Sequence, residues 1–135
     1  MKRISVIIGL LMIVLMVYLS SCKKPAGEGG KASIKGSVWV EDYNSAFTVL
    51  NGSYNGADVE VYIIYGDETN FGERLRANYE GKFEFNYLRP GKYKVYVYSK
   101  DNTLQSESGM VTVVKEVEIK SKKEVVDLGQ ISIYN

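Results

Sequence analysis

The chain has few of the residues that most often carry chemistry in proteins. It contains no histidine, one cysteine and two prolines in 135 residues. The lack of histidine removes the commonest general base and metal ligand, and it excludes histidine-containing catalytic triads. One cysteine cannot form a disulfide within the chain, so the fold must be held by packing alone. Only arrangements such as Ser–Lys or paired carboxylates remain open for catalysis.

The chain also lacks an excess of charge of either sign. Its 17 basic and 16 acidic residues give a net charge of +1. Proteins that bind nucleic acid usually carry a strongly basic face, so we expect no nucleic-acid partner.

One long hydrophobic run is present, at the N-terminus. Lys2 and Arg3 precede residues 4–19, which carry no charge, and Leu19-Ser20-Ser21-Cys22 closes the run. A basic start, an apolar stretch and small residues before a cut are marks of an export signal. The run is short for a membrane-spanning helix, which needs about 20 apolar residues. A retained membrane helix and an ordinary secretory peptide cut elsewhere are the alternatives.

The position of the cysteine distinguishes these readings, because it comes directly after the run. The segment resembles a bacterial lipoprotein signal peptide with its lipobox. That resemblance implies cleavage before Cys22, lipidation of Cys22 and attachment to a bacterial membrane, with the outer membrane favoured and the domain outside the cytoplasm. The predicted organisation is a signal peptide over 1–21, a lipidated Cys22 with a flexible tether over 22–32, and one domain over 33–135.

The domain itself is predicted to be all β. Several segments alternate apolar and polar residues with a period of two, which is typical of strands with one buried face. The expected strands are 33–40, 57–65, 73–79, 82–87, 92–99, 110–120 and 125–134. Two bulges are expected, near Lys115, which would otherwise point inward, and at Gly129, where the apolar phase switches. Two long polar segments, 41–56 and 99–109, are read as loops that are either functional or disordered.

The order of several short motifs resembles the carboxypeptidase-regulatory-like, or transthyretin-like, β-sandwich. These are Gly36-Ser37-Val38, Gly56-Ala57-Asp58-Val59, Gly81-Lys82-Phe83-Glu84-Phe85, the segment from Leu88 to Val97, and Leu128-Gly129-Gln130-Ile131. The match covers residues 33–134 and implies a seven-stranded immunoglobulin/transthyretin-like sandwich. Such domains commonly serve as accessory, adhesive or structural modules without an active site. The 41–56 segment is longer than the usual first loop.

Four aromatic residues are candidates for a ligand or partner face. Alternation places Trp39, Tyr62, Tyr96 and Tyr98 on the outside of the sheets, where such rings can stack on sugars or anchor an interface. The alternative is that they form cross-strand pairs that stabilise the sheet.

Three further patterns in the sequence are weaker. Glu41, Asp42 and Asn44, like Asp67, Glu68 and Asn70, carry the oxygen ligands that calcium prefers, although they lack the spacing of a calcium loop. Collagen-adhesin B-type repeats are a related sandwich class with a Lys–Asn crosslink. By that resemblance Lys35 could join Asp127 or Asn135, although alternation points Lys35 outward.

The sequence thus predicts a non-catalytic, membrane-anchored lipoprotein that acts as a binding or structural module in the bacterial cell envelope. The alternative is a carbohydrate-binding accessory module of a glycan-uptake system. The expected partners are the membrane, through the lipid, and an envelope protein or glycan. We expect no catalytic residues, metal or cofactor.

Overall fold

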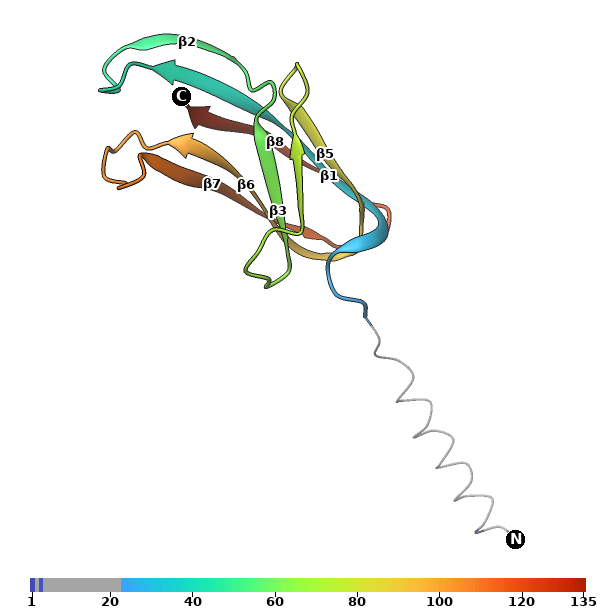
Figure 1. Ribbon diagram of the computed structural model, residues 1–135. Helices are drawn as coiled ribbons and strands as arrows, with labels where there is room; N and C mark the ends of the chain where they lie inside the picture. The colour runs from blue at the N-terminus through green and yellow to red at the C-terminus, as the bar shows by residue number, and fades with distance from the viewer. Residues whose placement is uncertain (2, 4–22) are drawn as a thin grey trace.

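Eight β-strands form two sheets that pack face to face (Figure 1). The computed structural model describes Met1, Arg3 and residues 23–135. The strands are β1 (Glu28–Tyr43), β2 (Leu50–Asn55), β3 (Glu60–Tyr65), β4 (Glu73–Arg76), β5 (Lys82–Leu88), β6 (Gly91–Lys100), β7 (Met110–Ile119) and β8 (Val125–Tyr134). The predicted all-β sandwich is therefore confirmed. In the described part of the chain, no helix is long and apolar enough to cross a membrane.

The long strand β1 organises the first sheet. Strand β8 runs parallel to it along one edge, from the Ser33–Val125 pair to the Glu41–Tyr134 pair. The other edge is shared by two antiparallel strands, β5 along the first half of β1 and β2 along the second half. The second sheet is antiparallel, in the order β4-β3-β6-β7.

The core lies between the sheets and follows the predicted alternation in the central strands. Every second residue of β6 from Tyr93 to Ser99 is buried, and parts of β1 and β5 alternate in the same way, because successive side chains point to opposite faces of a strand. The core residues include Ile34, Val38, Val40, Val61, Ile63, Phe83, Phe85, Leu88, Tyr93, Val95, Val97, Ile119, Ile131 and Ile133.

The strand count differs from the prediction, because residues 50–55 form β2 inside the expected 41–56 loop. All of β2 except Gly52 is exposed, so its side chains show no alternation of apolar and polar residues. Its pairing with β1 comes from backbone hydrogen bonds, which leave no pattern in the sequence. The seven strands of the prediction are therefore eight.

Of the two expected bulges, one is present. Gly129 has φ +70°, and the register of β8 on β1 shifts beside it, as predicted. Near Lys115, however, β7 pairs with β6 without interruption. Lys115 stays exposed in the regular strand because β7 is the edge of its sheet, where an inward position already lies beside solvent.

The tether prediction is wrong for residues 25–32, because the fold begins before residue 33. The backbone carbonyl of Pro25 accepts a hydrogen bond of 2.8 Å from Arg89 Nε, and the Gly27 amide donates to the Tyr93 hydroxyl at 2.9 Å. The glycine-rich composition that suggested flexibility has another cause. A Cβ on Gly30 would collide with the Leu88 carbonyl, so only glycine permits this close approach of β1 to β5.

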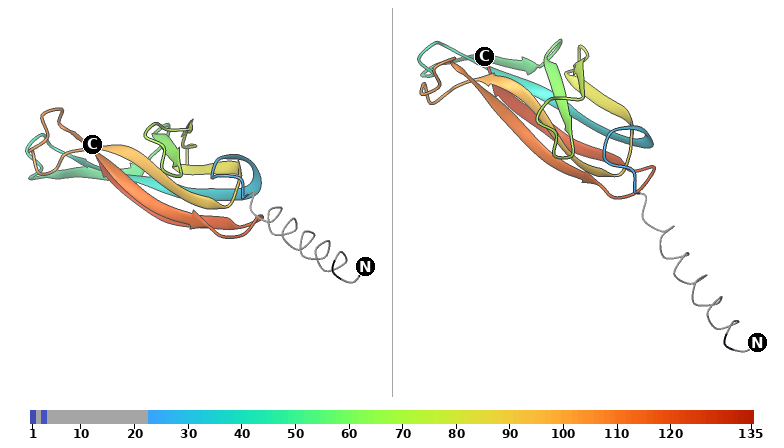
Figure 2. Two further views of the ribbon diagram at one scale, coloured as in Figure 1. Left: turned by 90° about the horizontal axis from the view of Figure 1, so that it is seen from below. Right: turned by 60° about the horizontal axis from the view of Figure 1, so that its bottom comes forward.

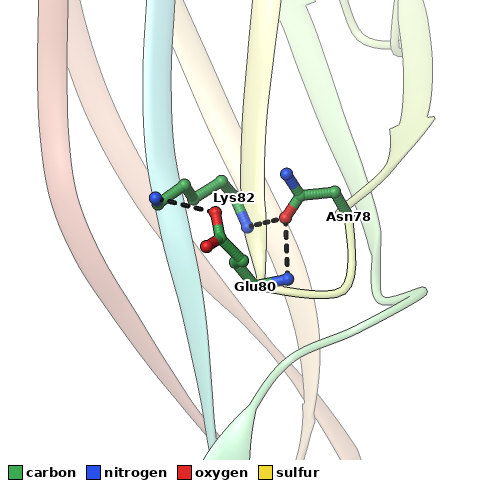
Figure 3. Close-up of polar contacts among 3 residues, drawn as sticks. All are labelled: Asn78, Glu80 and Lys82. Atoms are coloured by element: carbon green, nitrogen blue, oxygen red, sulfur yellow. Dashed lines mark hydrogen bonds and ion pairs between the residues drawn. The ribbon is translucent and has the colours of Figure 1, made fainter.

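A tight turn joins β4 to β5. The side-chain oxygen of Asn78 accepts hydrogen bonds of 2.9 Å from the amides of Glu80 and Lys82, and the Lys82 ammonium lies 2.8 Å from the Glu80 carboxylate (Figure 3). Gly81 has φ +73°, as expected for a glycine in a hairpin connection. Its carbonyl accepts from the amide of Val38, so this turn also attaches to β1.

Candidate functional site

Three of the four predicted aromatic residues meet on the outer face of the second sheet. Tyr62 of β3 stacks on Tyr96 of β6, with ring centroids 4.9 Å apart and planes 8° from parallel. Tyr98 meets Tyr62 and Tyr96 edge to face at 5.6 and 5.8 Å. Phe71, from the loop between β3 and β4, packs on Tyr62 at 5.2 Å. We call Tyr62, Phe71, Tyr96 and Tyr98 the aromatic face.

The register of the strands produces this cluster. Tyr62 is directly opposite Tyr96 across the β3–β6 pair, and Tyr98 follows on the same side of β6. Tyr62 is only 9% exposed, whereas Phe71 and Tyr98 are 48% and 47% exposed. The stacked pair therefore stabilises the sheet, while Tyr98 and Phe71 leave ring surface open to a ligand.

A small charged network borders the aromatic face. The Tyr62 hydroxyl donates a hydrogen bond of 2.7 Å to the Glu60 carboxylate, and Arg74 and Arg76 each lie 3.5 Å from the same carboxylate. The hydrogen bond from Tyr62, followed by the attraction of the two arginines, lowers the pKa of Glu60. The same hydrogen bond raises the pKa of Tyr62. Glu60 is therefore ionised at neutral pH and serves to orient Tyr62 rather than to donate a proton.

Trp39 is not part of this face. It lies on β1 in the other sheet, opposite Asn55 of β2 and Ser132 of β8, and it is half-buried. Alternation placed Trp39 on the face of β1 that is turned away from Val38 and Val40. A period of two, however, does not tell which sheet a strand joins. The four residues therefore do not form a single platform.

A groove opens beside Tyr98, near the start of β3, where the chain crosses from β2 in the first sheet to β3 in the second. It has a volume of about 430 Å³. Its floor includes the apolar side chains of Val40 and Ile133, and its rim carries Tyr54, Tyr98 and Tyr134. Polar groups of Glu60, Lys100 and Asn135 also line it. Flat rings combined with a few hydrogen-bonding groups suit a ligand with both an apolar face and hydroxyl groups.

Two of these rim residues were not predicted as site residues. Tyr134 packs edge to face on Tyr43 and Phe47, at 5.8 Å from each. Its amide donates to the buried hydroxyl of Ser99 on β6, which joins the two sheets at this end. Tyr54 lies on β2 and its hydroxyl accepts from Asn135 at 3.3 Å. In the sequence, Tyr54 was indicated only as one of the aromatic residues of the 41–56 segment, and nothing indicated Tyr134 as a site residue.

The structure also bears on the calcium-type groups and on the Lys35 crosslink. Among the described residues, no group of three or more metal-ligating side chains comes together. Lys35 and Asp127 are opposite each other on β1 and β8, with Nζ 3.9 Å from Oδ2, and their side chains are 48% and 60% exposed. They form a surface ion pair. Cys22, the predicted lipidation site, lies outside the described residues.

Comparison with known proteins identifies no family. No family model and no curated protein matches the chain. Among solved structures, a candidate carbohydrate-binding protein from Pseudomonas aeruginosa is similar over 82% of this chain and 92% of its own, with 11% identity and a TM-score of 0.47. An (S)-allantoin synthase (10% identity, TM-score 0.44) is similar over 80% of this chain and 43% of its own. A 9R-lipoxygenase from Cyanothece (12% identity, TM-score 0.43) is similar over 93% of this chain and 20% of its own.

These likenesses are distant, with every TM-score below 0.5. The function of the chain is therefore argued from its own residues.

Proposed function

We propose that the protein is a lipoprotein of the bacterial cell envelope, held to a membrane through a lipidated Cys22 and acting as a non-catalytic binding or structural module. The observation that carries the proposal is the position of the only cysteine, directly after the uncharged run of residues 4–19. The described fold begins at Pro25, three residues later, so a cut before Cys22 leaves all eight described strands intact.

The proposed family is the carboxypeptidase-regulatory-like, transthyretin-like sandwich. The eight-stranded, two-sheet fold is compatible with it, and several of its motif residues have the structural roles that such motifs require. Gly81 occupies the positive-φ position of a turn, and Phe83 and Phe85 are buried in the core. Because these residues shape turns and core, they support a module whose role depends on what it binds.

Cell fractionation of a Cys22→Ala variant tests the anchor. We expect the wild-type protein in the membrane fraction and the variant either released or left unprocessed, with an unchanged domain. Cys22→Ser is a matched variant that keeps a small polar side chain and should behave in the same way. Detergent-phase partitioning gives a second measure of membrane attachment. A Cys22→Ala protein that is cleaved normally and still partitions into the detergent phase would contradict the proposal.

A second candidate function, binding of carbohydrate as an accessory module in glycan uptake, is supported by the aromatic face and the adjoining groove. Tyr98 contributes to both, and its exposed ring could stack on a sugar while Glu60, Lys100 and Asn135 bind hydroxyl groups.

A glycan array separates the two functions. If a sugar binds the wild-type domain, Tyr98→Ala should weaken the signal strongly, and Tyr54→Ala should weaken it less. Tyr79→Ala is the matched control, since Tyr79 is 90% exposed in the β4–β5 turn, away from the groove. The absence of binding to any glycan would exclude the carbohydrate function and leave the anchored module.

A further inference from the structure

The end of the sandwich where the chain enters carries a cluster of lysines. The turn between β7 and β8 contains Lys120, Lys122 and Lys123, all exposed. The Ser33 amide donates to the Glu124 carbonyl at 2.9 Å, which holds this turn beside β1. Lys31, on that part of β1, is also exposed. We call Lys31, Lys120, Lys122 and Lys123 the lysine patch.

The lysine patch is not neutralised by ion pairs within the described residues. The nearest acid in sequence, Glu124, is turned toward the backbone of its own loop. Its carboxylate accepts hydrogen bonds from the amides of Lys120 and Ser121 at 2.6 and 3.1 Å. These hydrogen bonds, and then the attraction of Lys120, lower the pKa of Glu124, and the hydrogen bonds fix its side chain within the turn. The ammonium groups of Lys31, Lys122 and Lys123 therefore remain available to an outside partner.

The connection to Cys22 is short, which limits how far this end can lie from a membrane. Arg89 holds Pro25, and the three residues from Cys22 to Pro25 span at most about 10 Å. That is close to the Debye length of about 8 Å at physiological ionic strength. In both views of Figure 2 the β7–β8 turn lies beside the point at which the chain leaves the domain.

The same end of the sandwich also carries acidic side chains. Glu28, Asp67 and Glu68 line a hollow of about 590 Å³, together with Pro25, Arg89 and other residues of the entry segment and the β3–β4 loop. Burial and the neighbouring charge of Glu28 raise the pKa of Glu73 close by. An anionic surface would attract the lysine patch and repel these carboxylates, so the patch is the part of this end that suits contact with such a surface.

We propose that the lysine patch is a membrane-facing surface that binds anionic lipid headgroups. The proposal rests on the lipid anchor at Cys22, which brings this end to the membrane. Each lysine near an anionic surface contributes roughly a fivefold preference for binding. The patch therefore adds a second, electrostatic attachment to the lipid.

Lysine acetylation on vesicles tests this surface. The full lipidated protein is bound to vesicles of phosphatidylcholine alone, or of phosphatidylcholine with phosphatidylglycerol, and the modification rate of each lysine is measured by mass spectrometry. We expect the lysine patch to react roughly fivefold more slowly on the anionic vesicles. Lys100, nine residues along β6 from Gly91 and about 30 Å away, should react equally on both.

Charge-reversal variants supply the control. Lys122→Glu with Lys123→Glu should abolish the protection of Lys31 and Lys120, whereas Lys82→Glu with Lys100→Glu should leave it intact. Equal reactivity on both vesicles, or protection that survives Lys122→Glu with Lys123→Glu, would overturn the membrane-facing surface while leaving the anchor standing. A wild-type protein that associates with neither vesicle would overturn the anchor and this surface together.

Discussion

The amide of Gly27 donates a hydrogen bond of 2.9 Å to the phenolic oxygen of Tyr93, 66 residues later in the chain. The same hydroxyl donates to the carbonyl of Arg89 at 2.6 Å, so one buried oxygen joins the start of the fold to the β5–β6 turn. This contact makes the glycine-rich entry segment part of the sandwich.

Removing this hydroxyl should loosen the entry segment. Tyr93→Phe keeps the buried ring but leaves the Gly27 amide without its partner, which should lower the free energy of unfolding by about 1–3 kcal/mol. Urea denaturation would measure this, and trypsin should cut after Lys31 faster in the variant. Tyr87→Phe is the control, since Tyr87 is 74% exposed. Equal trypsin sensitivity of wild type and Tyr93→Phe would contradict a structural role for the contact.

A series of glycine substitutions should separate backbone strain from collision. Gly109→Ala meets open space at φ +70°, so it should cost only about 1–2 kcal/mol of strain. Gly81→Ala should cost more, because its Cβ would also lie 2.5 Å from the Val38 carbonyl oxygen. Gly52→Ala has neither problem and should change stability by less than about 0.5 kcal/mol. The melting temperatures of the three variants give the order of their stabilities. If Gly81→Ala is no less stable than Gly109→Ala, the collision with Val38 is excluded.

Asp101 should make stability depend on pH in the acid range. Its carboxylate accepts from the Thr103 hydroxyl and from the amides of Thr103, Gln105 and Ser106, and these hydrogen bonds lower its pKa to about 2. The folded state therefore gains stability above the ordinary pKa of 3.8, and this gain disappears as the pH falls from about 4 to about 2.

Asp101→Asn should accordingly lower the melting temperature at pH 7, with a difference from wild type that shrinks toward pH 2. Asp67→Asn makes the same change of charge in an exposed loop and serves as the control. A difference that stays constant with pH would mean that the carboxylate charge is not responsible.

No crosslink is expected between Lys35 and Asp127. Both side chains are about half exposed, and their atoms lie 3.9 Å apart as an ordinary surface ion pair. The intact mass of the purified domain should therefore equal that of its sequence plus any lipid. A mass lower by one water would show that the amide bond forms after all.

The sequence predicted the central strands well because their two faces differ in environment. Phe83 and Phe85 on β5, and Val95 and Val97 on β6, are buried as their alternation requires. Prediction failed where that contrast is lost. Strand β2 is exposed on both faces, and Tyr79 falls in the β4–β5 turn. Tyr87 has φ +60°, which breaks the alternation of β5, so Tyr87 is exposed and Leu88 is buried.

The candidate site was predictable only in part. Alternation identified Tyr62, Tyr96 and Tyr98 as outward residues, but the β3–β6 register that stacks the first two depends on pairing between distant segments. For the same reason the sequence could not show that Trp39 lies in the other sheet, away from these three tyrosines. The groove could not be predicted, because it forms between the two sheets where residues from six strands converge.

The parallel pairing of β1 with β8 also has a consequence for how the protein is made. Ser33 pairs with Val125, so the first sheet closes between segments 92 residues apart. Contacts of such long range slow folding, because the loop-closure entropy is lost before the contacts form. The sandwich therefore cannot be completed until the last strand is available, and the nascent chain stays unfolded for longer. Slow closure would suit the export that the proposed lipoprotein signal implies, because an exported chain crosses the membrane before it folds.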